Sequence, residues 1–218
     1  MPMVTDKFGK PSSGQMPGIV EAIVIDNVDP EQLGRVKVKF PMLPEAPDSF
    51  WARLVMPMAG KERGWMTIPE IDDEVIVAFM HGNFNDAVVL GAVYNGVDKP
   101  PYANEDKKNN LRVFQSRSGH RVTFDDTDGA EKIELHTFDK SIRVVWDAAN
   151  KQLTVYSAKD IMIEAEEKIQ LACKEFMLTA NENISIKAGG NIDVKSGGTI
   201  AEQAAGNFSA TSPKLLLN

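Results

Sequence analysis

From Leu153 to the C-terminus the sequence repeats an apolar position about every eight residues, and this repeat constrains the fold more than any other feature. In most copies a second apolar residue follows two positions later, and a small residue follows two positions after that. One step, from Ile169 to Phe176, is a residue shorter than the others. Residues two apart in a strand point to the same side, so each repeat predicts a short strand with one apolar face, followed by a corner. Such a period is typical of a solenoid-like rod rather than an enzyme core.

The apolar positions of the octads define the predicted core of this rod. They are Leu153, Val155, Ile161, Ile163, Ile169, Leu171, Phe176, Leu178, Ile184, Ile186, Ile192, Val194, Ile200, Phe208 and Leu216. The corners fall between them, for example at residues 166–168 and 189–191, where glycine supplies unusual backbone angles in the second case.

Two closures satisfy the octad pattern. Three octads of one chain would form one turn of a triangular solenoid, or three identical chains would wrap together with one strand each per level. A homotrimer of this kind would be about 40 Å long, with strands roughly 4.8 Å apart. Because every copy carries the same face and none is specialised as a distinct side, the pattern favours the trimer.

Charge and cysteine content exclude several classes of protein. The net charge is −7, which argues against a protein that grips nucleic acid phosphates. Cys173 is the single cysteine, so no intrachain disulfide forms. No run of about 18 apolar residues is present, so no spanning helix is expected. Residues 1–17 contain no apolar signal segment, and we expect assembly in the cytoplasm without a signal peptide.

The first half of the chain is rich in β signals. Strands are predicted at residues 19–25, 35–40, 51–56, 65–68, 74–80 and 88–94, and so many short strands favour a small closed barrel. Further strands at 111–114, 122–124, 133–135 and 142–146 are spaced unevenly and form a neck before the octads. The expected organisation is a flexible arm at 1–17, a barrel at 18–99, a linker and β neck at 100–152, and the octad rod at 153–218.

Several ordered motifs resemble one known family. They are Val-Asp-Pro-Glu-Gln-Leu-Gly-Arg-Val-Lys-Val-Lys-Phe-Pro at 28–41, Phe-Trp-Ala-Arg at 50–53, Pro-Met-Ala-Gly at 57–60, the run at 69–79, Val-Leu-Gly at 89–91, the run at 94–101, Ser-Arg-Ser-Gly-His-Arg at 116–121 and Phe-Asp-Asp at 124–126. This set resembles the contractile-tail spike family of phage baseplate assembly protein V and the VgrG spikes of type VI secretion. The resemblance implies an all-β fold, with an N-terminal OB-fold barrel followed by an intertwined triple-stranded β-helix in a homotrimer.

The resemblance also implies a function without catalysis or cofactors. The chain is expected to be the structural central spike of a contractile injection machine and part of a tail-like particle, docking on a baseplate hub protein and piercing the target envelope in transient contact with its membrane. The family's large N-terminal hub domain and lysozyme insertion have no counterpart in the sequence, which favours a spike with a separate hub. A trimeric tail fibre that binds or degrades surface glycans is the alternative.

Further predictions concern individual residues. Leu215, Leu216 and Leu217 are expected to form an apolar tip surface, which in this family a small PAAR-like protein often covers. Glu202 stands where other octads place an aliphatic residue, so three copies near one axis would need a cation, a trapped water or partial protonation, unless a local slip turns the side chain outward. Trp51 and Trp65 are expected in the barrel core. No catalytic, cofactor-binding or further metal-binding residues are expected.

Overall fold

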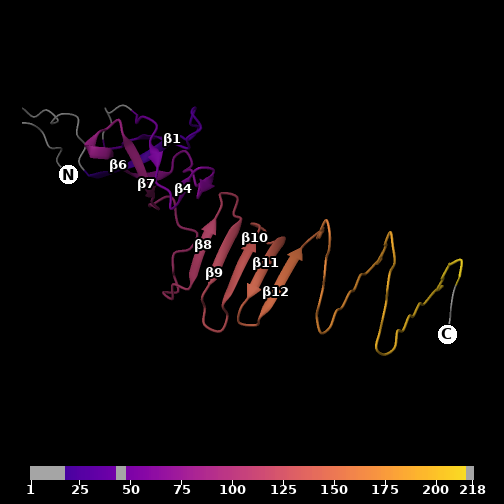
Figure 1. The fold of residues 1–218 in the computed structure, drawn as a ribbon. Coiled ribbons are helices and arrows are strands. Elements are labelled where there is room, and N and C mark those ends of the chain that lie inside the picture. Colours follow the sequence, from indigo (N-terminus) through magenta and orange to yellow (C-terminus); the bar gives the residue numbers. More distant parts are fainter. Residues whose placement is uncertain (1–17, 43–47, 215–218) are drawn as a thin grey trace, which may run out of the picture. The chain divides into compact units, whose positions relative to one another are not determined.

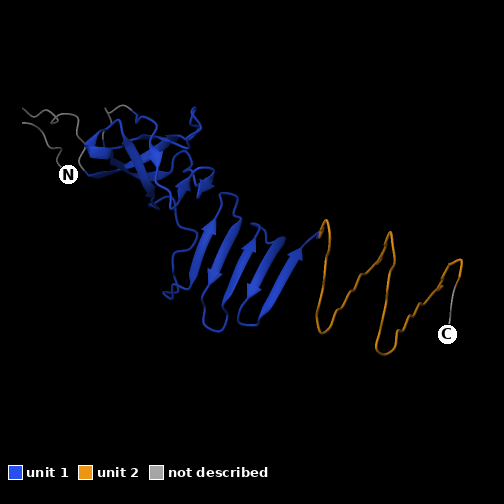
Figure 2. Cartoon of the chain, viewed as in Figure 1, with its two compact units in different colours: residues 1–161 blue, residues 162–218 orange. Residues whose placement is uncertain are grey.

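The computed structural model describes residues 18–42 and 48–214, and the expected arm at 1–17 lies outside them (Figure 1). The chain divides into two units, residues 1–161 and residues 162–218 (Figure 2). Nearly all regular structure in the described residues is β, as predicted; a single 3-10 turn, η1 (Met80–Gly82), interrupts it. None of the described segments forms a helix with the length and hydropathy needed to span a bilayer.

The first sheet closes on itself as a barrel. Its strands are β1 (Ile19–Asp26), β2 (Lys37–Lys39), β3 (Arg53–Leu54), β6 (Glu74–Phe79) and β7 (Ala87–Ala92), in the order β2-β1-β6-β7-β3. The two end strands meet through an antiparallel bridge between Val36 and Ala52, whose backbone groups exchange hydrogen bonds of 3.0 and 2.7 Å. This bridge joins the ends of the sheet, so the barrel leaves no long open edge.

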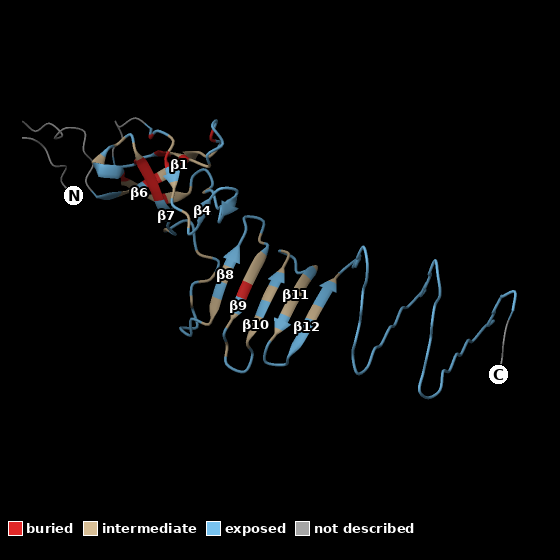
Figure 3. Cartoon of the chain, in the orientation of Figure 1, coloured by how far each residue is buried: buried red, intermediate tan, exposed pale blue. Residues whose placement is uncertain are grey.

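Small aliphatic side chains fill the barrel because its interior is narrow. In β6 the buried residues alternate with partly exposed ones, as expected for a strand with one face toward a core (Figure 3). Three aromatic rings, Phe40, Phe79 and Phe84, pack together with centroids 5.3 to 5.6 Å apart. The core residues are Ala22, Val24, Val36, Val38, Phe40, Ala52, Val75, Val77, Phe79, Ala87 and Val89.

One predicted barrel strand is wrong. Residues 65–68 form no strand, although they are rich in β-prone residues. Instead a short hairpin of β4 (Ala59–Gly60) and β5 (Arg63–Gly64) lies just before them. Gly64 has a φ of 157° and its Cβ position would lie 2.7 Å from the carbonyl oxygen of Met58, so this turn leaves no room for a side chain. The local backbone geometry of the hairpin therefore overrides the side-chain preference of the residues that follow it.

The predicted neck strands are confirmed, and a fifth joins them. β8 (Leu111–Gln115), β9 (Arg121–Asp125), β10 (Lys132–His136), β11 (Ile142–Asp147) and β12 (Gln152–Ser157) form an antiparallel meander in the order β12-β11-β10-β9-β8. Strand β12 contains the first octad, from Leu153 to Ser157, so the repeat begins inside this sheet. Tight turns with side-chain caps connect the strands; Asp147, for example, accepts a hydrogen bond from the Asn150 N–H.

The second unit has the expected corners but no ladder. Bends fall at 166–167, 174, 181–182, 189–190, 197–198, 205–206 and 213, which confirms the corner positions, including a shortened corner beside the seven-residue step. Within described residues 159–214 no backbone–backbone hydrogen bond forms. This part of the chain therefore runs as a series of open turns, and the single-chain solenoid, which requires a ladder between its own octads, is not what the chain adopts (Figure 1).

The barrel core predicts a stability change. Val77→Ala should lower the free energy of unfolding by about 1.5–3 kcal/mol, because it removes fully buried methyl groups and leaves a cavity. Urea denaturation followed by tryptophan fluorescence measures this change. Val97→Ala is the matched control: Val97 is 87% exposed, and its loss should alter the free energy by no more than about 0.5 kcal/mol. Equal effects of the two substitutions would contradict the placement of Val77.

Candidate assembly surface

One face of the neck sheet is apolar and uncovered. Residues opposite each other in an antiparallel pair share a face, and the register places apolar side chains opposite one another across all five strands. One row contains Phe114, Val122, Leu135, Val144 and Val155, and the next contains Phe124, Ile133, Trp146 and Leu153. Most of these side chains are exposed, including Phe114, Trp146 and Leu153. The sheet thus has a broad apolar surface that no other part of unit 1 covers.

The same apolar character continues along the sequence into the second unit. There the described octad core residues, from Ile161 to Phe208, are 53% to 73% exposed, although they are aliphatic or aromatic. Exposed apolar surface of this extent marks an interaction site in a soluble protein. The predicted core residues are therefore aligned by the repeat but are not buried within one chain.

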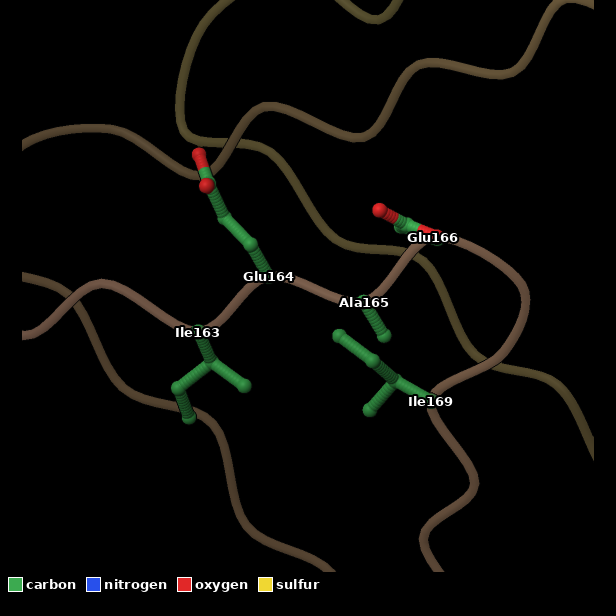
Figure 4. Close-up of a pocket in the computed structure, with 5 residues that line it drawn as sticks. All are labelled: Ile163, Glu164, Ala165, Glu166 and Ile169. Atoms are coloured by element: carbon green, nitrogen blue, oxygen red, sulfur yellow. The ribbon is translucent and has the colours of Figure 1, made fainter. Parts of the chain in front are cut away.

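Figure 4 shows how one corner arranges these side chains. Ile163 and Ala165 project to one side of the chain and Glu164 to the other, while Ala165 and Ile169 point toward each other across the corner. The corner surrounds an open hollow of about 540 Å³ lined by Ile163, Glu164, Ala165, Glu166 and Ile169. The alternation of inward apolar and outward charged side chains follows the period of two within the octad, as the sequence predicts.

Serine hydroxyls fix several of the corners, a role that the sequence pattern did not reveal. The N–H groups of Lys159, Gly198 and Lys214 donate to the Oγ atoms of Ser157, Ser196 and Ser212, two residues earlier, at 3.1 to 3.3 Å. These three serines occupy the small position of their octads. Serine there both fits a crowded site and supplies a local acceptor that turns the backbone.

In the barrel, a single carboxylate organises the connection between β1 and β2. Asp29, whose side chain is 3% exposed, accepts hydrogen bonds from the backbone N–H groups of Glu31, Leu33 and Arg35 and a bidentate pair from the Arg35 guanidinium at 2.8 Å. The Arg35 side chain and these N–H groups hold the pKa of Asp29 well below its usual range. Gly34 has a φ of 70°, and a Cβ there would overlap the Met66 side chain.

This clamped loop carries apolar side chains at its surface. Val28 and Leu33, which flank the Asp29 carboxylate in sequence, are both exposed. A loop that is fixed by five hydrogen bonds and still exposes two aliphatic side chains is preorganised for contact with another surface. The sequence motif at 28–41 thus has a physical basis that residue spacing alone did not indicate.

The other singled-out residues lie apart from one another. The core placement predicted for Trp65 is wrong: it is 55% exposed and meets Phe114 edge to face, with centroids 6.4 Å apart. Trp51 is half-buried, with the Lys37 ammonium 5.3 Å from its ring centroid. Glu202 and Cys173 are exposed in the single chain. Leu215, Leu216 and Leu217 lie outside the described residues.

The described residues contain no cluster of potential metal ligands: no three His, Cys, Asp or Glu side chains come together among them in a way that could bind a metal ion. Several side chains with shifted pKa values take part in turns. The pKa of Asp139, for example, falls to about 2 because Thr137 and Ser141 donate hydrogen bonds to it.

Comparison with known proteins matches the barrel to a family. Residues 20–94 match the model of the type VI secretion system/phage-baseplate injector OB domain. The chain is 32% identical over 136 residues to the type VI secretion system spike protein VgrG3 of Vibrio cholerae, covering 59% of this chain and 12% of that protein. It is 40% identical over 82 residues to the spike protein VgrG2a of Pseudomonas aeruginosa, covering 36% of this chain and 10% of the relative.

These matches confirm the resemblance to the contractile-tail spike family. Residues 20–94, which are similar to the OB domain of this injector family, are the segment in which the structure shows a closed barrel. The chain spans only about a tenth of the length of these two relatives, so the similarity concerns one part of those proteins.

The Asp29 clamp predicts a dependence of stability on pH. Because the folded pKa of Asp29 lies below its unfolded value of about 3.9, the carboxylate stabilises the fold fully above that pH, and its contribution disappears as the pH falls through the folded pKa. Asp29→Asn should therefore lower the Tm near neutral pH and flatten the fall of Tm in acid. Thermal unfolding measured from about pH 7 to pH 2.5 tests both effects.

The matched control for this test is Asp26→Asn. Asp26 accepts one hydrogen bond, from the Val28 N–H, and its removal should change the pH profile little. An Asp29→Asn profile that keeps the wild-type slope in acid would show that the clamp does not contribute to stability in this way.

Proposed function

We propose that three copies of this chain assemble through the apolar neck face and the octads into the central spike of a contractile injection machine. The observation that carries the proposal is the exposure of the apolar side chains in both units: those on one face of the neck sheet and those at the apolar positions of the described octads. Identical chains supply a matching partner surface because each presents the same residues at every level. The similarity to VgrG spike proteins supports the same assignment.

The backbone of the octads supports a trimer independently of the side chains. Buried backbone N–H and C=O groups need hydrogen-bond partners, and those of described residues 159–214 have none from their own backbone. Strands from two other chains, interleaved between successive turns, would pair these groups and fill hollows such as the one beside Ile163. Side chains and backbone would then be satisfied together, as in an intertwined triple-stranded β-helix.

The proposed mechanism is mechanical and requires no catalytic residues. Chains that are hydrogen-bonded to one another at every level can separate only when many ladder bonds break together, so such a rod resists axial load. The barrel, with its clamped loop at Asp29, would dock on a hub protein of the baseplate. The rod would transmit the force of contraction to the target envelope and touch its membrane transiently. The particle would assemble in the cytoplasm and would not bind nucleic acid.

Two features of the rod follow from this arrangement. The three Glu202 carboxylates would approach one axis, where a cation, a water or a shared proton would have to reduce their repulsion. At the C-terminal end, Leu215, Leu216 and Leu217 of three chains would form an apolar surface for a PAAR-like tip protein.

The trimer proposal predicts a change of mass on a single substitution. The wild-type chain should scatter light as a species of about 72 kDa, three times the 24.0 kDa of one chain. Ile186→Asp should abolish this species, because three carboxylates would replace aliphatic contacts at one level. Ser185→Asp is the matched control, since residue 185 is on the opposite face of the same strand, and it should leave the mass unchanged. A wild-type protein that stays folded as a monomer after dilution would overturn the proposal.

The tip proposal is tested by binding to a PAAR-repeat protein. In a pull-down with the full-length spike, Leu216→Asp together with Leu217→Asp should reduce capture about ten-fold or more, because charged groups would replace the apolar contact. Ser209→Asp, at an outward octad position, is the control and should bind normally. Capture that is unaffected by the double substitution would exclude the leucine tip as the binding surface.

A further inference from the structure

Two arginines and a histidine form a row on adjacent strands of the polar face of the neck sheet. The register places Arg121 of β9 opposite His136 of β10, and His136 opposite Arg143 of β11. Directly opposite residues share a face, so the three side chains stand next to one another across the sheet.

Neutral groups hold these side chains in place and leave their outer donors available. Arg121 Nε donates to Thr123 Oγ1 at 3.0 Å, and the Arg143 guanidinium lies over the Tyr156 ring, 4.5 Å from its centroid. His136 Nδ1 lies 2.7 Å from the carbonyl oxygen of Thr137 and donates to it, so Nε2 of the neutral ring is an acceptor and the available donors are those of the two arginines. Within the described part of the chain, none of the three forms an ion pair with a carboxylate.

The acidic side chains around the row are mostly engaged elsewhere. Asp125 accepts hydrogen bonds from Thr127 and lies 4.0 Å from the Lys132 ammonium. Asp139 accepts hydrogen bonds from Thr137 and Ser141 within its own turn. Asp147 accepts hydrogen bonds from Asn150.

Glu134 is the exception among these acids. It lies on the same face, opposite Thr123 and Val145, one row away from the cations. Cationic charge therefore exceeds anionic charge at this end of the sheet, in a chain whose net charge is −7.

A hollow lies over part of the row. Its volume is about 500 Å³. Three cations, Arg121, Lys132 and the turn residue Lys140, and two carboxylates, Asp125 and Glu134, line it together with His136 and neutral residues such as Gln115 and Phe138. Lys140 lies in the turn between β10 and β11, so it approaches from a different direction than the strand residues. Donors from two strands and one turn converge on this space. A tetrahedral phosphate accepts hydrogen bonds from several directions, whereas the two oxygens of a bound carboxylate lie in one plane.

We propose that this row is a binding site for a phosphate group, with Arg121 and Lys140 as ligands and Arg143 as a flanking charge. Guanidinium groups bind phosphate oxygens through paired N–H donors, and a tetrahedral dianion accepts from donors on several sides. The site lies within one sheet of a single chain. It therefore does not depend on the trimer and goes beyond the mechanical function proposed above.

Titration calorimetry of the full-length protein with inorganic phosphate, at about 50 mM salt, tests the proposal. The wild type should bind saturably in the millimolar range, and Arg121→Gln should weaken binding about ten-fold or more. Lys151→Gln is the matched control, because it removes an exposed cation from the turn between β11 and β12, outside the lining of the hollow; it should change affinity by less than about two-fold. Glu134→Gln should strengthen binding, because it removes the nearby unpaired acid.

Vesicles identify the source of the phosphate. Co-sedimentation with phosphatidic acid vesicles but not with phosphatidylcholine vesicles, lost in Arg121→Gln, would assign the site to a phosphomonoester headgroup. Binding of free phosphate without co-sedimentation would assign it to a soluble phosphate. Light scattering of the same samples separates this result from the state of the trimer.

Three outcomes would overturn the proposal. The first is a wild-type protein that takes up no phosphate. The second is an equal loss of affinity in Arg121→Gln and Lys151→Gln, which would indicate non-specific attraction. The third is tighter binding of a glutamate-rich peptide than of phosphate, which would make the row a contact for an acidic protein segment. Arg121→Lys, which retains the charge, keeps the test informative if Arg121→Gln disturbs the sheet, and it should bind with intermediate affinity.

Discussion

The structure depends on an apolar surface that one chain cannot bury by itself. In the neck, one row of apolar side chains crosses all five strands and a second crosses four of them, from β9 to β12, on the same face. In the described octads after β12 the apolar spacing continues without a backbone ladder. Local turns align these side chains but supply neither the apolar contacts nor the hydrogen bonds that a strand needs, and in the proposed assembly the other chains would supply both.

The barrel solves the same problem in the opposite way. Its end strands meet at Val36 and Ala52, and its alternating small side chains fill a narrow interior within one chain. The connection between β1 and β2 is fixed by one carboxylate, Asp29, rather than by packing. A closed domain of this kind can keep the Asp29 loop in one conformation without a partner. The octads, in contrast, would gain their apolar contacts and backbone hydrogen bonds only in the proposed assembly.

The sequence predicted the parts of the fold that depend on periodicity. The octad corners, the neck strands and three of the six barrel strands lie close to their predicted positions, and two more barrel strands, β2 and β3, lie within the predicted ranges but are shorter. Residues 65–68 were mistaken for a strand because their composition is β-prone, while the hairpin before them depends on backbone geometry at Gly64. Trp65 was expected in the core for the same reason. Neither the Asp29 clamp nor the row of Arg121, His136 and Arg143 was found, because both arise from cross-strand register or loop geometry that spacing along the chain does not encode.

The two faces of the neck sheet differ in chemistry because side chains alternate along each strand. Alternation sends Phe114 and Trp146 to one face and Arg121 and His136 to the other, so the proposed assembly surface and the proposed phosphate site are separated by the thickness of one sheet. The polar face is the more sheltered one: Thr123 is buried and Arg121 and His136 are half-buried, while Phe114 and Trp146 are exposed. In an isolated domain this distribution would be unfavourable. The proposed assembly would reverse it, because the apolar face would then be covered and the face left in water would be the one that carries the charged side chains.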